Sequence, residues 1–181
     1  SEHLLSLRAY RSNKTKSINV PEAKLMNESA PCKGNNYLSG HAELILSSFL
    51  RTTGKHLIDP NLAEQSDRAL FEAGFCVLSH NDDLDPIFSY GNQAALDLFE
   101  MSWDQLTSLP SRLSAEPQLR EERERLLVEV AEKGYIDSYK GIRVSSSGKR
   151  FMVENSIVWN LIDESGQRHG QAAVLYQWKA L

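Results

Sequence analysis

The chain has few of the residues that cross-link or anchor a small protein. Its two cysteines, Cys32 and Cys76, lie far apart, with no CxxC motif and no histidine at metal-ligand spacing. Neither a disulfide framework nor a zinc knot is therefore indicated, and a reducing compartment fits best. No apolar run approaches the roughly 18 to 20 residues that a membrane span needs. We expect a soluble protein without a membrane-spanning helix.

Several functional signatures are also missing. The net charge of −4 provides no electrostatic footprint for nucleic-acid binding. There is no glycine-rich phosphate loop, and no histidine can be assigned to a nucleophilic triad. The cluster of His80, Asp82, Asp83 and Asp85 does not have EF-hand spacing and is explained by turn chemistry. We therefore predict no catalytic residues, no metal site and no nucleic-acid partner.

The charge is distributed unevenly along the chain. Residues 1–40 contain six Lys or Arg, three acidic residues and six Ser, whereas the rest of the chain is acidic. This basic, acid-poor arm shows no sustained hydrophobic period and should not fold alone. It is similar to the end of an organelle transit peptide, and the alternative is an ordinary disordered arm. We expect it to contact a partner surface.

Two helices are predicted over residues 41–74. An apolar stripe from Ala42 to Leu50 indicates an amphipathic helix that ends near Gly54. Asp59 as N-cap and Pro60 at the first helical position begin a second helix, which Gly74 ends. We expect this helical lead-in to pack on the main module, residues 75–181.

The main module reads as two strands, three helices and three strands. Strands are predicted at 75–79 and 87–90, followed by helices that Asn92 and the Ser102–Gln105 capping box begin. A long amphipathic helix with a stripe from Leu119 to Ala131 ends at Gly134. Period-2 strands follow at 135–145, 149–161 and 169–178. This order predicts an α+β fold, a five-stranded antiparallel sheet with helices on one face, preceded by two helices.

The residues themselves resemble a known family. Residues 88–99, FSYGNQAALDLF, resemble the stretch of a PAS domain in which a strand leads through Asn into the first helix. Residues 108–117 (SLPSRLSAEP), 158–163 (VWNLID) and 170–173 (GQAA) together look like the MEKHLA domain, a PAS-like family. The resemblance covers roughly residues 44–178. Family members occur at the end of class III homeodomain leucine-zipper transcription factors and as small stand-alone proteins of plants, algae and cyanobacteria. This chain resembles the stand-alone type, which implies sensing or association.

A PAS-like fold encloses space for a ligand, so each familiar cofactor can be tested by the residue it needs. The sequence argues against a flavin adduct, because residues 103–117 contain no Cys, and against haem, because residues 118–133 contain no His, Cys or Met. The cofactor stays unknown. A carboxylate ligand would need converging cationic and hydroxyl groups, for which the candidates are Arg112, Ser114, Tyr139 and Arg143. The alternative is that both arginines face solvent or form salt bridges.

Three residues of the late strands complete the candidates. By the period-2 rule, Asn155 shares a face with Trp159 and Leu161, so that it would either orient a ligand or tie down a neighbouring loop. Trp159 and Trp178 are candidate interface residues.

Three functional hypotheses follow. The first is a non-enzymatic PAS-like module that binds a small ligand, a protein partner or both. The second is a structural or accessory subunit of a larger plastid assembly, with no ligand and with residues 1–40 along its partner. The third, a small-ligand enzyme, lacks an identifiable acid–base pair. The arm and the distribution of the family favour the plastid stroma over the cytoplasm or nucleus.

Overall fold

The computed structural model describes residues 29–181. Short 3₁₀ helices span Lys33–Leu38 (η3), Pro60–Gln65 (η4), Ser111–Ser114 (η5) and Pro117–Leu119 (η6). The α-helices are α1 (Ser39–Thr53), α2 (Ser66–Phe71), α3 (Gln93–Phe99), α4 (Trp103–Leu106) and α5 (Arg120–Lys133). The strands are β1 (Cys76–His80), β2 (Phe88–Gly91), β3 (Tyr135–Val144), β4 (Arg150–Ile162), β5 (Arg168–Leu175) and β6 (Gln177–Ala180).

The strands form one antiparallel sheet in the order β2-β1-β5-β4-β3. The two N-terminal strands therefore lie beside the three C-terminal ones, which confirms the predicted fold class. The predicted strand at residues 169–178 is interrupted at Tyr176, and the residues after the break form β6. Both β5 and β6 pair with β4, in one continuous register. The sheet thus gains a short sixth strand, whose four residues are all exposed.

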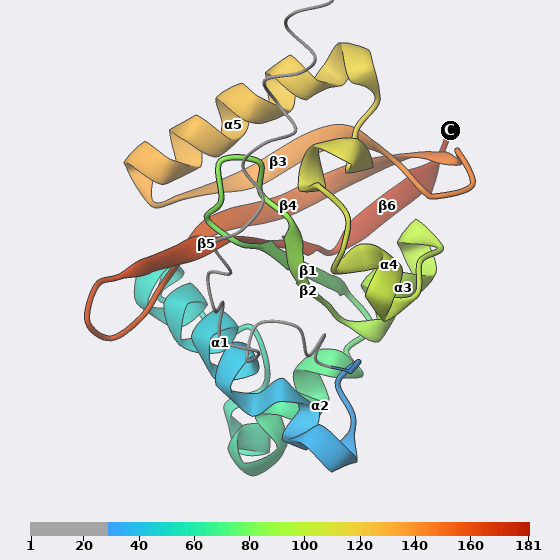
Figure 1. Cartoon of the computed structure of the whole chain (residues 1–181). Helices are drawn as coiled ribbons and strands as arrows, with labels where there is room; N and C mark the ends of the chain where they lie inside the picture. Colours follow the sequence, from blue (N-terminus) through green and yellow to red (C-terminus); the bar gives the residue numbers. More distant parts are fainter. Residues whose placement is uncertain (1–28) are drawn as a thin grey trace, which may run out of the picture.

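Helices cover both faces of the sheet (Figure 1). Helices α3 and α5 pack on one face, here called the inner face, and α1 packs against β4 on the other, the outer face. The residues that α1 contributes to the core are Ala42, Ile45 and Phe49. The helical lead-in consequently completes the hydrophobic core and leaves the inner face to the helices of the main module.

Asn92 holds the junction of the lead-in, the first strand and α3. Its side chain is fully buried, and its Oδ1 accepts hydrogen bonds from the backbone N–H groups of Val77 (2.9 Å) and Ala95 (3.1 Å). Its Nδ2 donates to the carbonyls of Leu70 (3.2 Å) and Phe75 (2.7 Å). The predicted helix cap is confirmed, and the same side chain also satisfies backbone groups from two other segments.

A β-bulge in the middle of β4 reverses the facing of its side chains. Asn155 has a φ of 50°, and the pairing of β3 with β4 shifts register at this level, where Ser138 of β3 has a φ of 56°. Val153 lines the inner face, but Trp159 faces α1 on the outer one. An extra residue in a strand offsets the two-residue period, so an odd-numbered residue before the bulge and one after it face opposite ways.

The bulge makes the sequence interpretation of Asn155 wrong. Asn155 is exposed and does not share the buried face of Trp159; its Nδ2 donates to Oε1 of Gln177 at 2.8 Å. The position of Trp159 is also corrected, because the indole is fully buried in the core and is not available to a partner. Trp178 on β6 is 39% exposed.

Most of the basic arm, residues 1–28, lies outside the described residues, so its predicted contact with a partner stays a prediction. Residues 29–40 run into η3 and the start of α1, and Tyr37 and Leu38 pack against the core. The ring of Tyr37 lies 6.3 Å from that of Phe71. Over residues 29–181, no helix is long and apolar enough to cross a membrane.

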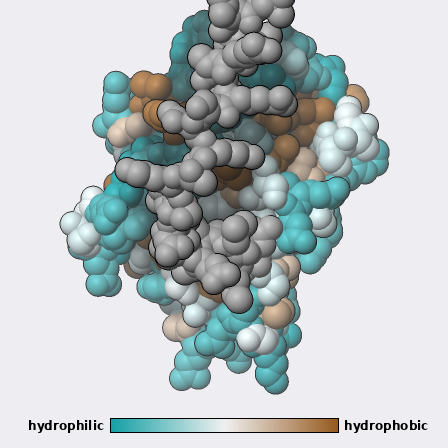
Figure 2. All heavy atoms as spheres, viewed as in Figure 1, coloured by the Kyte–Doolittle hydropathy of each residue, from teal (hydrophilic) through white to brown (hydrophobic). Residues whose placement is uncertain are grey.

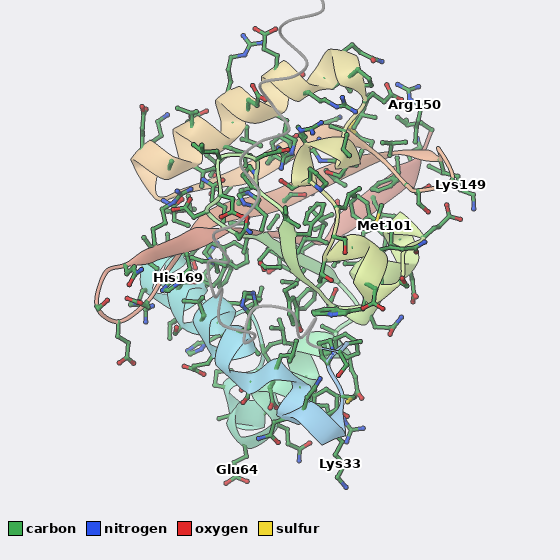
Figure 3. The ribbon with its side chains drawn as sticks, viewed as in Figure 1. Lys33, Glu64, Met101, Lys149, Arg150 and His169 are labelled. Atoms are coloured by element: carbon green, nitrogen blue, oxygen red, sulfur yellow. The ribbon has the colours of Figure 1, made fainter. Side chains whose placement is uncertain are left out.

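Ion pairs attach the connections between elements to the sheet. Lys149 and Arg150, at the turn between β3 and β4, lie at the edge of the molecule (Figure 3). Lys149 pairs with Glu100 at the end of α3 at 2.6 Å, and Arg150 pairs with Glu116 before η6. The Ser145 hydroxyl also donates to Glu100. The connection from α3 to α5 is thereby held against the β3–β4 turn.

Candidate functional site

A cavity of about 70 Å³ lies between the inner face of the sheet and helix α5. Its apolar walls include Leu78, Phe88, Phe99, Val153 and Val158. Its polar lining residues are Ser79, His80, Ser114, Arg123, Tyr139, Arg143 and Gln171. On the face drawn in Figure 2, hydrophobic residues gather in the upper half, whereas the visible surface of the lower half is mostly hydrophilic.

Two buried amides connect the sheet to α5. Asn160 of β4 and Gln171 of β5 are register partners on the inner face. Asn160 Nδ2 donates to the carbonyl of Val130 at 3.0 Å. Gln171 Nε2 donates to the carbonyl of Leu127 at 2.8 Å and to Oδ1 of Asn160 at 3.1 Å. The position of α5 over the cavity therefore depends on a specific hydrogen-bond network as well as on apolar packing.

His80 continues this polar row on β1, opposite Gln171. It is 7% exposed, and its Nδ1 lies 2.8 Å from the carbonyl oxygen of Asn81. Because a carbonyl only accepts, Nδ1 carries the proton, and in the neutral ring Nε2 is an acceptor. Burial lowers the pKa of His80. Among residues 29–181, Nε2 of His80 has no hydrogen-bond partner although it is buried.

Arg123 is a buried cation on the apolar stripe of α5. It is 7% exposed, and its Nη2 donates to Oγ of Ser111 at 2.8 Å. Ser111 is itself positioned by Ser114, whose hydroxyl donates to its carbonyl at 2.7 Å. Burial, and secondarily the charge of Arg143, lower the pKa of Arg123 to about 10. Its guanidinium therefore stays charged at neutral pH.

Tyr139 and Arg143 form the wall of the cavity on β3. Arg143 Nη2 donates to the Tyr139 hydroxyl at 2.8 Å, and its guanidinium carbon lies 5.4 Å from the centre of the Tyr139 ring. The phenol lies across Gly141, where a Cβ would come within 2.1 Å of the hydroxyl. Together with Arg123, these two side chains also line a second, more open groove of about 210 Å³. The cavity and this groove are therefore neighbours that share three lining residues.

The structure separates the sequence-predicted ligand residues. Ser114, Tyr139 and Arg143 all line the cavity. Arg112 does not, because its Nε and Nη2 donate to the two carboxylate oxygens of Asp85 at 3.0 and 3.1 Å, the salt-bridged alternative. Arg123 lies in the cavity instead. A basic residue inside the apolar stripe of a helix was the signal that could have found it.

The acidic turn after β1 is occupied by internal contacts. Asp82 pairs with Arg168 and Asp85 with Arg112, while Asn81 donates to Asp83. In the described part of the chain, no group of three or more His, Cys, Asp or Glu side chains is arranged to hold a metal ion.

The comparisons with known proteins agree with the fold. The family profile of the MEKHLA domain matches residues 39–180. The chain belongs to the MEKHLA domain family. The MEKHLA match begins at the start of α1, and so it includes the helix that covers the outer face of the sheet.

One curated relative is the homeobox-leucine zipper protein ATHB-9 of Arabidopsis thaliana. It is 28% identical over 93 residues, which cover 51% of this chain and 11% of that protein. The match thus spans only a small part of the length of ATHB-9.

Solved structures place the MEKHLA domain of this chain in the PAS fold. The PAS domain of a protein from Colwellia psychrerythraea superposes with a TM-score of 0.56 at 15% identity, covering 66% of this chain and 97% of that one. An RNA-binding light-oxygen-voltage receptor superposes with a TM-score of 0.52 at 14% identity, covering 67% of this chain and 34% of that one. A light-oxygen-voltage domain superposes with a TM-score of 0.51 at 14% identity, covering 67% of this chain and 87% of that one. At these identities the likeness shows the fold alone.

The cavity does not fit the flavin of a light-oxygen-voltage domain. Its volume of about 70 Å³ is well below the roughly 300 Å³ at which cofactor sites begin. Cys76 and Cys32 are both absent from its lining, so no thiol is placed to add to a ring.

Proposed function

We propose that this MEKHLA domain is a non-enzymatic sensor that binds a small molecule in the cavity between the sheet and α5. The observation that carries the proposal is that His80 lines this cavity and that its buried Nε2 has no hydrogen-bond partner in the described part of the chain. A buried acceptor without a donor costs about 1–3 kcal/mol, and a bound ligand would remove that cost. The cavity lining contains no carboxylate to act with a second group as an acid–base pair, which favours binding over catalysis.

The arrangement of α5 suggests how occupancy is transmitted. The helix is held to the sheet by the amides of Asn160 and Gln171, which lie next to His80 in one polar row. A ligand that bonds to this row or presses on α5 alters the position of the helix relative to the sheet. A partner that contacts the outer surface of α5 would read that change.

Native mass spectrometry tests this proposal. The chain purified from its source should retain a small mass that denaturation releases. Ala173→Leu, which fills the cavity from β5, should lose that mass, while Val128→Leu on the exposed face of α5 should keep it. Equal retention by both variants would place the ligand elsewhere and contradict the proposal.

Association with a protein partner is the second candidate function. Strand β6 is exposed, and Tyr176, Trp178 and Leu181 are large hydrophobic residues with 42%, 39% and 60% exposure at this end of the sheet. An exposed strand edge with aromatic residues can pair with a second copy of the chain. Sedimentation analysis should then show a dimer that Trp178→Lys dissociates; a wild-type monomer at all concentrations would contradict self-association.

The accessory role in a plastid assembly rests on the sequence of the arm. Residues 1–40 are basic and acid-poor, as in the end of a transit peptide, and we propose a location in the plastid stroma on that basis. Cell fractionation should recover the protein with stromal markers, and recovery only in nuclei would refute the location.

A further inference from the structure

Two guanidinium groups border the same small cavity of an acidic protein. The net charge of the chain is −4, yet the charged side chains that line the cavity are those of Arg123 and Arg143. Neither forms a salt bridge with a carboxylate in residues 29–181. Their hydrogen bonds go instead to neutral groups, the Ser111 and Tyr139 hydroxyls and the carbonyl of Ile142.

This arrangement is costly for an empty site. Burial of the Arg123 cation without a paired carboxylate is unfavourable; the charges of Glu124 and Asp85 offset only part of this, and the neighbouring Arg143 repels it. An anion between the two guanidinium groups would compensate both charges, and a planar carboxylate matches the fork of donors that each presents.

The third polar group of the cavity, Nε2 of His80, requires a hydrogen-bond donor and not an anion. His80 Nε2 is an acceptor, because Nδ1 uses its hydrogen for the carbonyl of Asn81. A carboxylate oxygen cannot donate to it, but a hydroxyl can. The walls beyond these three side chains are largely apolar, and the volume of about 70 Å³ admits only a small molecule.

We propose that the cavity binds a small hydroxycarboxylic acid, with the carboxylate between Arg123 and Arg143 and the hydroxyl donating to Nε2 of His80. This inference rests on the proposed ligand-binding function and names its chemical class.

The cavity and the second groove share three lining residues. Arg123, Tyr139 and Arg143 border both spaces, so moving the hydrogen-bonded Tyr139–Arg143 pair would join them. The combined space would approach the roughly 300 Å³ of small-molecule sites. Gly141 leaves room for the Tyr139 phenol in its closed position. An incoming carboxylate would exchange the bond from Arg143 to the neutral Tyr139 hydroxyl for one to an ionised acceptor.

Thermal unfolding of the full chain with defined probes tests the ligand class. Glycolate and lactate at about ten times their dissociation constant should raise Tm by about 3–6 °C. Acetate, which lacks the hydroxyl, should bind about 3- to 10-fold more weakly. Acetamide, which lacks the charge, should give no shift at the same concentration, and inorganic phosphate, which is tetrahedral and not planar, should give a smaller shift than glycolate.

Variants assign the roles of the side chains. Arg123→Met and Arg143→Met should each weaken glycolate binding about 10- to 100-fold. Arg125→Met, the same change on the exposed side of α5, should leave it unchanged. His80→Leu should remove the preference for glycolate over acetate. Gly141→Ala displaces the Tyr139 hydroxyl and should change the rate at which glycolate associates. This variant provides a second test of the site if an arginine variant fails to fold.

The outcomes separate this inference from the function on which it rests. A retained neutral ligand in native mass spectrometry, or a shift by acetamide or phosphate that equals that of glycolate, would overturn the hydroxy-acid assignment and leave ligand sensing intact. Equal loss of binding in Arg125→Met and Arg123→Met would overturn it as well. If no probe shifts Tm and no mass is retained, both proposals fail.

Discussion

The ring of Phe49 on α1 meets the indole of Trp159 on β4 edge to face, with the ring centroids 4.8 Å apart. Both side chains are almost completely buried, and Nε1 of Trp159 donates to the Ser48 hydroxyl at 3.2 Å. This contact joins the first helix to the centre of the sheet. The lead-in is therefore part of the core, which agrees with a family match that begins at residue 39.

Phe49→Ala should strongly destabilise the fold. Removal of the buried ring leaves a cavity against Trp159, for which we expect a loss of about 3–5 kcal/mol in the free energy of unfolding. Urea denaturation followed by circular dichroism measures the loss. Leu50→Ala, at a neighbouring residue that is 39% exposed, should cost less than about 1 kcal/mol. Similar losses for the two variants would contradict the central place of α1.

Asn92→Ala should lower the free energy of unfolding by at least about 3 kcal/mol, because it leaves several buried backbone groups without partners. The neighbouring Gln93→Ala, at an exposed position of α3, is the matched control and should cost less than about 1 kcal/mol. Urea denaturation of the two variants checks the difference. An Asn92→Ala loss as small as that of the control would show that its four hydrogen bonds contribute little.

Acid should destabilise the protein through His41. Burial, and secondarily the charge of His169, lower the pKa of His41 from 6.5 to about 4, so the unfolded chain binds a proton in this interval before the folded one does. The free energy of unfolding should therefore fall by about 2–3 kcal/mol as the pH drops from about 6.5 to about 4, because each pH unit between the two pKa values contributes about 1.36 kcal/mol. His80 contributes in the same direction.

Urea titrations at a series of pH values measure this dependence. His41→Gln should flatten the slope between pH 6.5 and 4 and leave the part that His80 contributes. An unchanged slope in His41→Gln would rule out His41 as its source.

The two thiols should differ in reactivity. Cys76 is fully buried, and burial raises its pKa to about 12, whereas Cys32 is exposed. A thiolate is the reactive species, so at pH 8 an aromatic disulfide reagent should label one thiol rapidly in the native chain and two after denaturation. Cys32→Ser should abolish the rapid reaction. Rapid labelling of Cys76 would indicate an opening of β1 from the core.

Local patterns in the sequence predicted the elements because their causes are local. Asp59, Asn92 and the Ser102–Gln105 box begin helices where their side chains accept from nearby backbone N–H groups. The alternation of the strands and the order of the elements were sufficient to predict the sheet and the PAS-like architecture, and the motif strings were sufficient for the MEKHLA resemblance.

Which side chains line the cavity depends on long-range contacts, and no local sequence pattern contains these contacts. The period-2 rule failed at Asn155, because a single residue with positive φ reverses which side of β4 faces the core. Arg112 and Arg123 could be told apart only when the fold brought Asp85 to the first and Ser111 to the second.

The sequence by itself thus determined the family, the order of the elements and the helix N-caps, since these follow from hydrophobic period and capping within a few residues. The second helix of the lead-in ends at Phe71 and not at the predicted Gly74. Which side chains face the cavity was decided by tertiary structure. A bulge and the pairing of segments far apart in the chain set the facing of each strand, and with it the burial of each polar group.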